Sequence, residues 1–277
     1  MDKNKVNVLD YPPGGLGNFI AQVLVNDNIV SSDRLSFHDN QDKQKWYVSL
    51  QDGSIDDSID ALITLKEKLK DPTLIGKLVI VHTYDHTLEL LNVPNIKLYQ
   101  VVVHEYGTIL FYNKHLKVYK HIGSNPKKTN IIETNWNTNE PWVEREFLVL
   151  ELKYQQSISN TQTIGVDHHI NFDNFYKNKD SFMHEVQRLN PIADVERLYK
   201  IFCDSQEPVL NKLQLVTGII DTIKQGIDTD ISHLELLDQA VVAGLLNNEY
   251  KNFEWQLPNK NTWFQTTGEI INIINKL

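Results

Sequence analysis

The most informative part of this chain is the glycine- and proline-rich stretch Tyr11-Pro12-Pro13-Gly14-Gly15-Leu16-Gly17-Asn18-Phe19. It follows a short apolar run at 6–9 and precedes apolar residues at 19, 20, 23 and 24, whose spacing predicts one face of a helix. Glycines let a backbone approach a phosphate closely, and the first N–H groups of a helix have no intrahelical partners. The order strand, glycine turn, helix therefore predicts an anion site. Its candidate residues are Pro13, Gly14, Gly15, Leu16, Gly17, Asn18 and Phe19.

The same stretch also has an interpretation without a ligand. Prolines and glycines are the residues that any tight connection between a strand and a helix uses. The stretch has neither the Lys-Ser/Thr of the Walker pattern nor the full dinucleotide fingerprint. Phosphate binding and a plain connection therefore both stay open at this point.

Composition narrows the class of protein. Hydrophobic residues make up 41% of the 277 residues and charged residues 23%, which is typical of a globular protein. The formal net charge of −9 argues against sequence-independent binding of nucleic acid, and no apolar run approaches the length of a membrane span. The single cysteine, Cys203, excludes an intramolecular disulfide and suits a reducing compartment. We expect a cytoplasmic protein with neither a nucleic acid nor a membrane as partner.

Strands and helices alternate through the first part of the chain. The pattern predicts helices at 54–69, 85–92 and 106–119 and strands at 78–81 and 96–103. This alternation is typical of an α/β fold with a doubly wound, mostly parallel sheet. We therefore expect an α/β nucleotide-binding half at 1–122. A mainly helical remainder at 123–277 would pack on the same domain.

The second part begins with a long polar loop at 123–141, a length that is often functional. After it the pattern predicts a helix at 142–154 and a strand at 163–172. Further helices are predicted at 180–189, 193–202, 208–224, 233–247 and from 268 onwards.

Two histidines follow predicted strands: His82 comes after Leu78-Val79-Ile80-Val81, and His104 comes after the strand at 96–103. In an open parallel sheet, ligands bind outside the carboxyl ends of the strands. Both histidines and the glycine stretch are therefore expected near one crevice. His82 is the candidate general base, because the pKa of histidine lies near neutral pH. The alternative is a hydrogen-bonded histidine at a strand end with no catalytic role.

With these residues in place, the chain resembles the sulfotransferase family, which has a P-loop-like α/β fold and uses 3′-phosphoadenylyl sulfate (PAPS). The stretch from Tyr11 to Phe19 is similar to the family's 5′-phosphosulfate loop. Ile80-Val81-His82-Thr83 resembles the strand end that carries a catalytic histidine, and 170–175 resembles a later strand of family members. The resemblance implies a P-loop NTPase-like, sulfotransferase-type sheet with a helical C-terminal part.

The resemblance also implies a function. The chain would transfer a sulfuryl group from PAPS to a hydroxyl acceptor, such as a carbohydrate, with no metal. His82 would act as the base, and His104 would lie at the 3′-phosphate site. The sequence departs from the family at two of these positions. Pro13 stands where a lysine or arginine is usual, and His104 stands nearest to the place of the 3′-phosphate arginine.

Three other interpretations stay open. Gly14-Gly15-Leu16-Gly17-Asn18 is similar to the loop of glycosyltransferases that use a GDP-sugar, although their His-x-Arg-Arg-Gly-Asp stretch is absent. Val166-Asp167-His168-His169 resembles the motif of the DHH phosphoesterases, in which His82, Asp85 and His86 could complete a manganese site. The chain could also be an inactive relative of the same fold that acts as a binding protein.

Overall fold

The computed structural model describes residues 1–12, 14–25, 47–49, 59–81, 92–114, 152 and 166–249. Within these residues the chain forms an α/β fold with an all-parallel, five-stranded sheet in the order β2-β3-β1-β4-β5. The strands are β1 (Val6–Asp10), β2 (Tyr47–Ser49), β3 (Leu78–Val81), β4 (Ile96–Val102) and β5 (His168–Asn171). The prediction of a doubly wound parallel α/β sheet is therefore confirmed.

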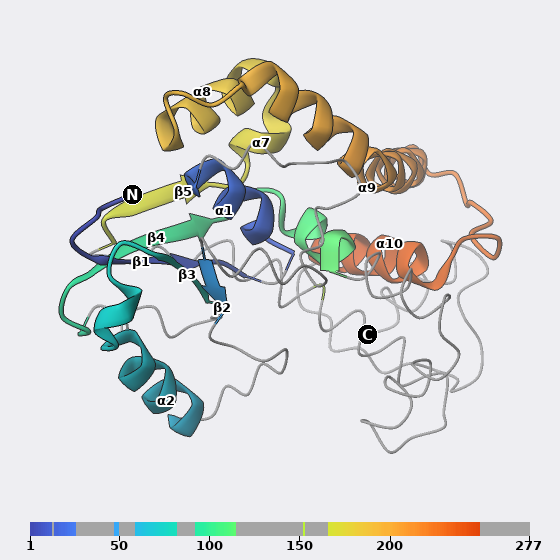
Figure 1. Cartoon of the computed structure of the whole chain (residues 1–277). Helices are drawn as coiled ribbons and strands as arrows, with labels where there is room; N and C mark the ends of the chain where they lie inside the picture. Colours follow the sequence, from blue (N-terminus) through green and yellow to red (C-terminus); the bar gives the residue numbers. More distant parts are fainter. Residues whose placement is uncertain are drawn as a thin grey trace, which may run out of the picture. The chain divides into compact units, whose positions relative to one another are not determined.

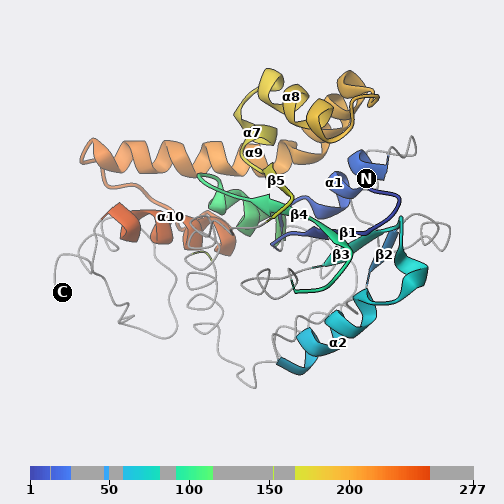
Figure 2. The ribbon, with the colours of Figure 1, turned by 90° about the vertical axis from the view of Figure 1, so that its left-hand side faces the viewer.

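The central strand β1 begins the chain's path through the sheet. From β1 the chain passes to the edge strand β2, returns through β3, and continues to β4 and β5 beyond β1. Crossovers between parallel strands are right-handed, so a reversal of direction sends successive helices to opposite faces. Helix α1 (Gly17–Val25) and helix α2 (Ile59–Leu69) accordingly lie on opposite faces of the sheet (Figures 1 and 2).

The face of the sheet towards α2 is packed with aliphatic residues. The cluster consists of Val6, Val8, Leu65, Leu69, Leu74, Val79, Val81, Val93 and Leu98. It joins alternate residues of β1, β3 and β4 to α2 and to the 3₁₀ turn η3 (Pro72–Leu74). β1 is buried along its whole length, as expected for a central parallel strand with both faces covered.

The opposite face is covered by α1 together with α7 (Asn174–Lys177) and α8 (Lys179–Leu189) (Figure 1). Aromatic rings fill this layer: Phe19 lies 5.8 Å from Phe175 and 5.7 Å from Phe202, measured between ring centroids. Phe182 lies 5.1 Å from Phe202 and from Tyr199. α1 is therefore anchored by its first turn, which places the loop before it rigidly on the sheet.

The long helix α9 (Val195–Lys224) corrects one prediction. The sequence predicts two helices, at 193–202 and 208–224, because proline lacks the N–H of an interior helical residue. The structure has one continuous helix with an exposed Pro208 inside it. Residues on both sides of the proline, Phe202 and Val209 among them, are buried. The helical backbone continues through Pro208 although this residue has no N–H to donate.

Other boundaries compare with the prediction as follows. β1, α1, β3, β4, α8 and α10 (Leu236–Glu249) lie where the sequence predicts them, and 107–114 is the described part of the helix predicted at 106–119. β2 and α7 are not predicted. The predicted helix at 85–92, the loop at 123–141 and the segment from 268 onwards lie outside the described residues, apart from Asn92.

The chain divides into two compact units that are discontinuous in sequence. The first consists of Met1–Tyr106 and Ile158–Glu207, and the second of Gly107–Ser157 and Pro208–Leu277. This division differs from the expected halves at 1–122 and 123–277, because β5 returns to pair with β4 in the first unit. Hydrogen bonding across the sheet, which local pattern does not encode, makes this difference.

Candidate functional site

The loop after β1 opens with a tight turn. The N–H of Gly15 donates to the carbonyl of Pro12 over 2.8 Å, and Gly14, the third residue of this turn, has φ +82°. A type II turn needs a positive φ at its third position, which glycine supplies without strain. A Cβ on Gly15 would lie 2.8 Å from the Pro12 carbonyl oxygen. Gly14 and Gly15 are therefore required by the turn itself.

Glycine is required at position 17 for a different structural reason. A Cβ at this position would lie 2.0 Å from Cζ of Tyr11, whose ring is buried against the start of α1. The backbone N–H of Tyr11 donates to the Val81 carbonyl over 3.3 Å, which ties the loop to the end of β3. The glycine at 17 thus admits an aromatic ring beneath the helix.

Leu16 stands immediately before α1 with φ +60°, a backbone conformation that is costly for a branched side chain. Its carbonyl accepts the first helical hydrogen bond, from the N–H of Ile20 at 2.9 Å. A leucine side chain cannot accept a hydrogen bond, so this position lacks the usual capping oxygen. In the part of the chain that the structure describes, the N–H groups of Gly17, Asn18 and Phe19 have no acceptor.

The backbone before α1 has the conformation of an anion-binding nest. Gly14 and Leu16 have positive φ values, and helical backbone follows at Gly17. Alternation of left-handed and right-handed residues turns successive N–H groups towards one side, and such a nest binds anions. The dipole of α1 adds positive potential at the same place. The loop after β1 can therefore hold an anion through backbone donors alone.

The loop after β4 lies at the same edge of the sheet, because β1 and β4 are parallel neighbours. Two of its backbone groups are occupied: a carboxylate oxygen of Asp173 accepts the N–H of Glu105 at 2.9 Å and the N–H of His104 at 3.1 Å. The side chains of His104 and Glu105 are exposed, whereas Asp173 is buried. Burial, and then the negative charges of Glu105 and Asp173, raise the pKa of Tyr106 above its ordinary value.

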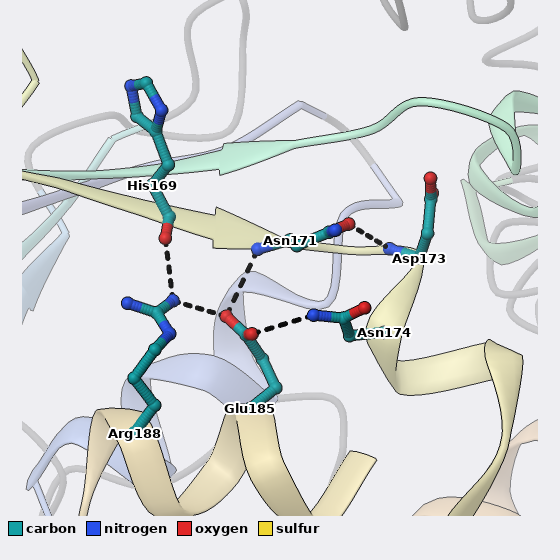
Figure 3. Close-up of polar contacts among 6 residues, drawn as sticks. All are labelled: His169, Asn171, Asp173, Asn174, Glu185 and Arg188. Atoms are coloured by element: carbon teal, nitrogen blue, oxygen red, sulfur yellow. Dashed lines mark hydrogen bonds and ion pairs between the residues drawn. The ribbon is translucent and has the colours of Figure 1, made fainter. Parts of the chain in front are cut away.

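Asp173 belongs to a polar cluster at the end of β5 (Figure 3). Its own N–H donates to Oδ1 of Asn171 at 3.0 Å, and the N–H of Asn171 donates to Glu185 at 3.2 Å. The buried Glu185 also accepts from the side-chain amide of Asn174 at 3.0 Å and from Arg188. In Figure 3 the Asp173 side chain points away from Glu185, and its carboxylate is the group that reaches the loop after β4.

The structure brings some of the predicted site residues together. Gly14, Gly15, Leu16, Gly17, Asn18 and Phe19 form one loop and helix start, and His104 lies at the end of the neighbouring strand. Two predicted residues, Pro13 and His82, lie outside the described residues, although β3 ends at Val81 as predicted.

The DHH-like stretch lies at the opposite edge of the sheet, where β5 begins. Asp167 accepts the N–H of Leu98 at 2.9 Å, and the His168 ring stacks on Tyr99 with centroids 5.0 Å apart. Burial, followed by the positive charges of Lys97 and Arg188, lowers the pKa of His168. Among the described residues, no three His, Cys, Asp or Glu side chains are grouped to hold a metal ion.

Comparison with known proteins adds no family to this description. No model of a protein family matches the chain, and the searches of curated proteins and of solved structures find no significant match. Among the helices that the structure describes, none combines the length and hydropathy needed to cross a membrane.

Sequence reasoning did not identify the role of Tyr11, Asp173 or Glu185. Tyr11 is quoted in the glycine stretch and Asp173 in the resemblance at 170–175, but neither carries a local signal for its partner. Asp173 contacts backbone groups 68 and 69 residues earlier in the chain. An acid between a strand and a helix predicts a capping residue, but the Asp173 side chain makes no capping hydrogen bond to α7, so this signal does not reveal its contact with the loop after β4.

Proposed function

We propose that this chain binds the phosphates of a nucleotide at the loop after β1 and transfers a sulfuryl group from PAPS to a hydroxyl acceptor. The observation that carries the proposal is the start of α1, where three N–H groups without an acceptor among the described residues follow a leucine held at φ +60°. A position without a capping oxygen and with a strained residue is costly unless something else requires it. An anion that accepts from these N–H groups supplies a reason.

The location of the loop supports the same proposal. It follows β1, from which the chain runs towards β2, whereas from the neighbouring strand β4 the chain runs in the opposite direction, towards β5. In open α/β sheets, ligands bind outside the carboxyl ends of the strands at such a reversal. The order β2-β3-β1-β4-β5 differs from the dinucleotide-binding order 3-2-1-4-5-6 and from the flavodoxin-like order 2-1-3-4-5. A P-loop-like sheet of the sulfotransferase type is the finer fold that we propose.

In the loop after β1, only backbone N–H groups are proposed to contact the phosphosulfate. With Pro13 in place of a loop lysine or arginine, the N–H groups of Gly17, Asn18 and Phe19 would carry the contact with the 5′-phosphosulfate. At the end of β4 the two backbone N–H groups are held by Asp173, so the exposed side chain of His104 is the available partner for a 3′-phosphate.

When bound, PAPS supplies the sulfuryl group, and PAP (adenosine 3′,5′-bisphosphate) leaves. We assign the proton of the acceptor hydroxyl to His82, which directly follows β3 in the sequence. Histidine suits this role because its pKa lies near the pH of the reaction. The acceptor is proposed as a hydroxyl compound such as a carbohydrate.

A thermal-shift experiment compares PAP, GDP and Mn²⁺ in parallel. A ligand that binds only the folded state stabilises it by an amount that grows with the logarithm of the ligand concentration relative to Kd, and so raises the melting temperature. We expect a shift with PAP. A shift with GDP alone would favour a GDP-sugar transferase, and a shift with Mn²⁺ alone would favour a phosphoesterase. No shift with any of the three would contradict nucleotide binding and favour an inactive relative.

Replacing a glycine of the loop cannot isolate the anion contact, because Gly15 and Gly17 are required by the turn and by Tyr11. Asn18→Pro removes one backbone N–H in the first turn, where proline breaks no helical hydrogen bond. Asn18→Ala is the matched control, because it removes the same side chain and keeps the N–H. We expect Asn18→Pro, but not Asn18→Ala, to weaken PAP binding by roughly tenfold, the scale of one charge-assisted hydrogen bond.

The assigned base is tested by sulfuryl transfer from PAPS to a panel of hydroxyl acceptors. His82→Ala should lower kcat about a hundredfold or more, the usual contribution of a positioned general base. PAP affinity should change little, because the imidazole would face the acceptor. Unchanged turnover in the variant would remove His82 from the mechanism.

A further inference from the structure

Asp173 accepts two consecutive backbone N–H groups of a loop at the carboxyl edge of the sheet. Oδ2 accepts from His104 at 3.1 Å and from Glu105 at 2.9 Å, and Oδ1 lies 3.3 Å from the His104 nitrogen. A charged acceptor makes such hydrogen bonds shorter and stronger than neutral ones. The backbone at 104–105 is thus held from a segment almost seventy residues later.

The position of Asp173 is itself fixed by β5. Its N–H donates to Oδ1 of Asn171, and the N–H of Phe172 continues the sheet by donating to the Val102 carbonyl at 2.9 Å. The loop has a second attachment nearby, where the Tyr106 ring lies 6.1 Å from the ring of Tyr176. The sheet therefore determines where the loop after β4 lies.

We propose that Asp173 is a positioning residue that fixes the loop at 103–106 so that the side chain of His104 is presented to the nucleotide. This inference rests on the proposed function. Because both N–H groups already donate to the Asp173 carboxylate, they are not available to an anionic ligand. The contact at this edge is therefore made by the His104 side chain, while the loop after β1 contributes backbone donors.

The variant Asp173→Asn removes the charge and one acceptor at nearly constant volume. Asp167→Asn is the matched control, because Asp167 accepts a backbone N–H of the same strand β4, from Leu98 at 2.9 Å, but at the opposite edge of the sheet. Two quantities are measured for each variant: amide hydrogen exchange at His104 and Glu105, and the Kd for PAP by calorimetry. Circular dichroism reports whether each variant folds.

We expect Asp173→Asn to speed exchange at both amides and to weaken PAP binding by about tenfold, the scale of one charge-assisted contact with a phosphate. Asp167→Asn should change neither quantity. Faster exchange with an unchanged Kd would overturn the positioning role. A wild-type chain that binds no PAP would contradict the proposed function, and the exchange rates would still report whether Asp173 holds the loop.

A second variant covers the case in which Asp173→Asn does not fold. His104→Ala alters an exposed side chain and should leave the fold intact while weakening PAP binding by a similar factor. If both variants fold, their effects should be strongly non-additive, because a mispositioned His104 has little contact left to lose. A loss of stability alone would not produce this coupling. Full affinity in His104→Ala, or additive effects of the two variants, would overturn the proposal.

Discussion

At the scale of single residues, Gly17 connects the sequence pattern to the packing of the loop. Its missing Cβ leaves the space that the buried Tyr11 ring occupies, and that ring supports the first turn of α1. The phosphate-loop pattern and the packing requirement therefore coincide at one position. A glycine in such a stretch is not by itself evidence of a ligand.

Gly17→Ala should destabilise the protein by about 1–3 kcal/mol, because the new methyl group would displace the Tyr11 ring from a closely packed site. Gly218→Ala is the control: its Cβ would meet nothing within 4 Å, and alanine favours the helix. Chemical denaturation measures both. In Tyr11→Ala the Gly17→Ala change should cost much less, since the clash is absent. Equal costs in the two backgrounds would contradict this explanation.

In the second unit, the titration of Tyr112 makes the stability of the fold depend on pH in a predictable direction. Its hydroxyl donates to Asp238 at 2.9 Å, and Lys212 donates to the other oxygen of Asp238 at 2.7 Å. Burial, and then the charge of Asp238, raise the pKa of Tyr112 far above its ordinary value of 10.0. The folded chain therefore keeps a proton that the unfolded chain releases in alkaline solution.

The buried, protonated Tyr112 contributes its full stabilisation of the folded state below about pH 10, the pKa of an unfolded tyrosine. This contribution is lost as the pH rises above that value towards the pKa of Tyr112 in the folded chain. The free energy of unfolding should therefore fall more steeply above about pH 10 in the wild type than in Tyr112→Phe. Denaturant titrations at several alkaline pH values compare the two slopes. At neutral pH the variant should lose about 1–3 kcal/mol, because a buried carboxylate loses a donor. Parallel curves would contradict the assignment.

At the scale of elements, two side chains of α8 close the outer edge of β5. Phe172 bonds to β4, so by alternation the backbone groups of His169 and Asn171 face away from β4. The His169 carbonyl accepts from Arg188 at 2.7 Å, and the Asn171 N–H donates to Glu185 (Figure 3). If a further parallel strand paired with β5, one of its residues would form hydrogen bonds with this carbonyl and this N–H. The ion pair therefore takes the place of that residue and protects the edge.

Arg188→Ala should expose the His169 carbonyl and leave the buried Glu185 without its cation. We expect a loss of about 3 kcal/mol or more in stability, the cost of an uncompensated buried charge, and concentration-dependent self-association through the open edge. The exposed pair Glu67–Lys70 has the same i,i+3 spacing, so Lys70→Ala is the control and should cost less than about 1 kcal/mol. Sedimentation velocity measures association. A monomeric, fully stable Arg188→Ala variant would contradict the role of the pair.

At the scale of the whole molecule, the order of strands decides which segments meet. β1, at the N-terminus, lies between β3 and β4, so the loop after β1 is flanked by the ends of two later strands. The formal net charge of −9 leaves anion binding to local donors rather than to a basic surface. The proposed function uses two such donors, the nest before α1 and the exposed side chain of His104.

The elements that could be predicted from the sequence are those with local signals. Apolar runs identify β1, β3 and β4, the glycine stretch identifies the turn before α1, and their alternation predicts a parallel α/β sheet. Burial of apolar side chains at fixed spacing drives these elements, and that spacing is visible in the sequence.

Local patterns do not reveal the short edge strand β2, the continuity of α9 through Pro208 or the pairing of β5 with β4. Nor do they reveal the ring beneath Gly17 or the carboxylate that holds the loop at 103–106. The physical reason is the same in each case. These features depend on contacts between packed side chains or across strands, and Asp173 and Glu105, 68 residues apart, leave no local pattern that links them.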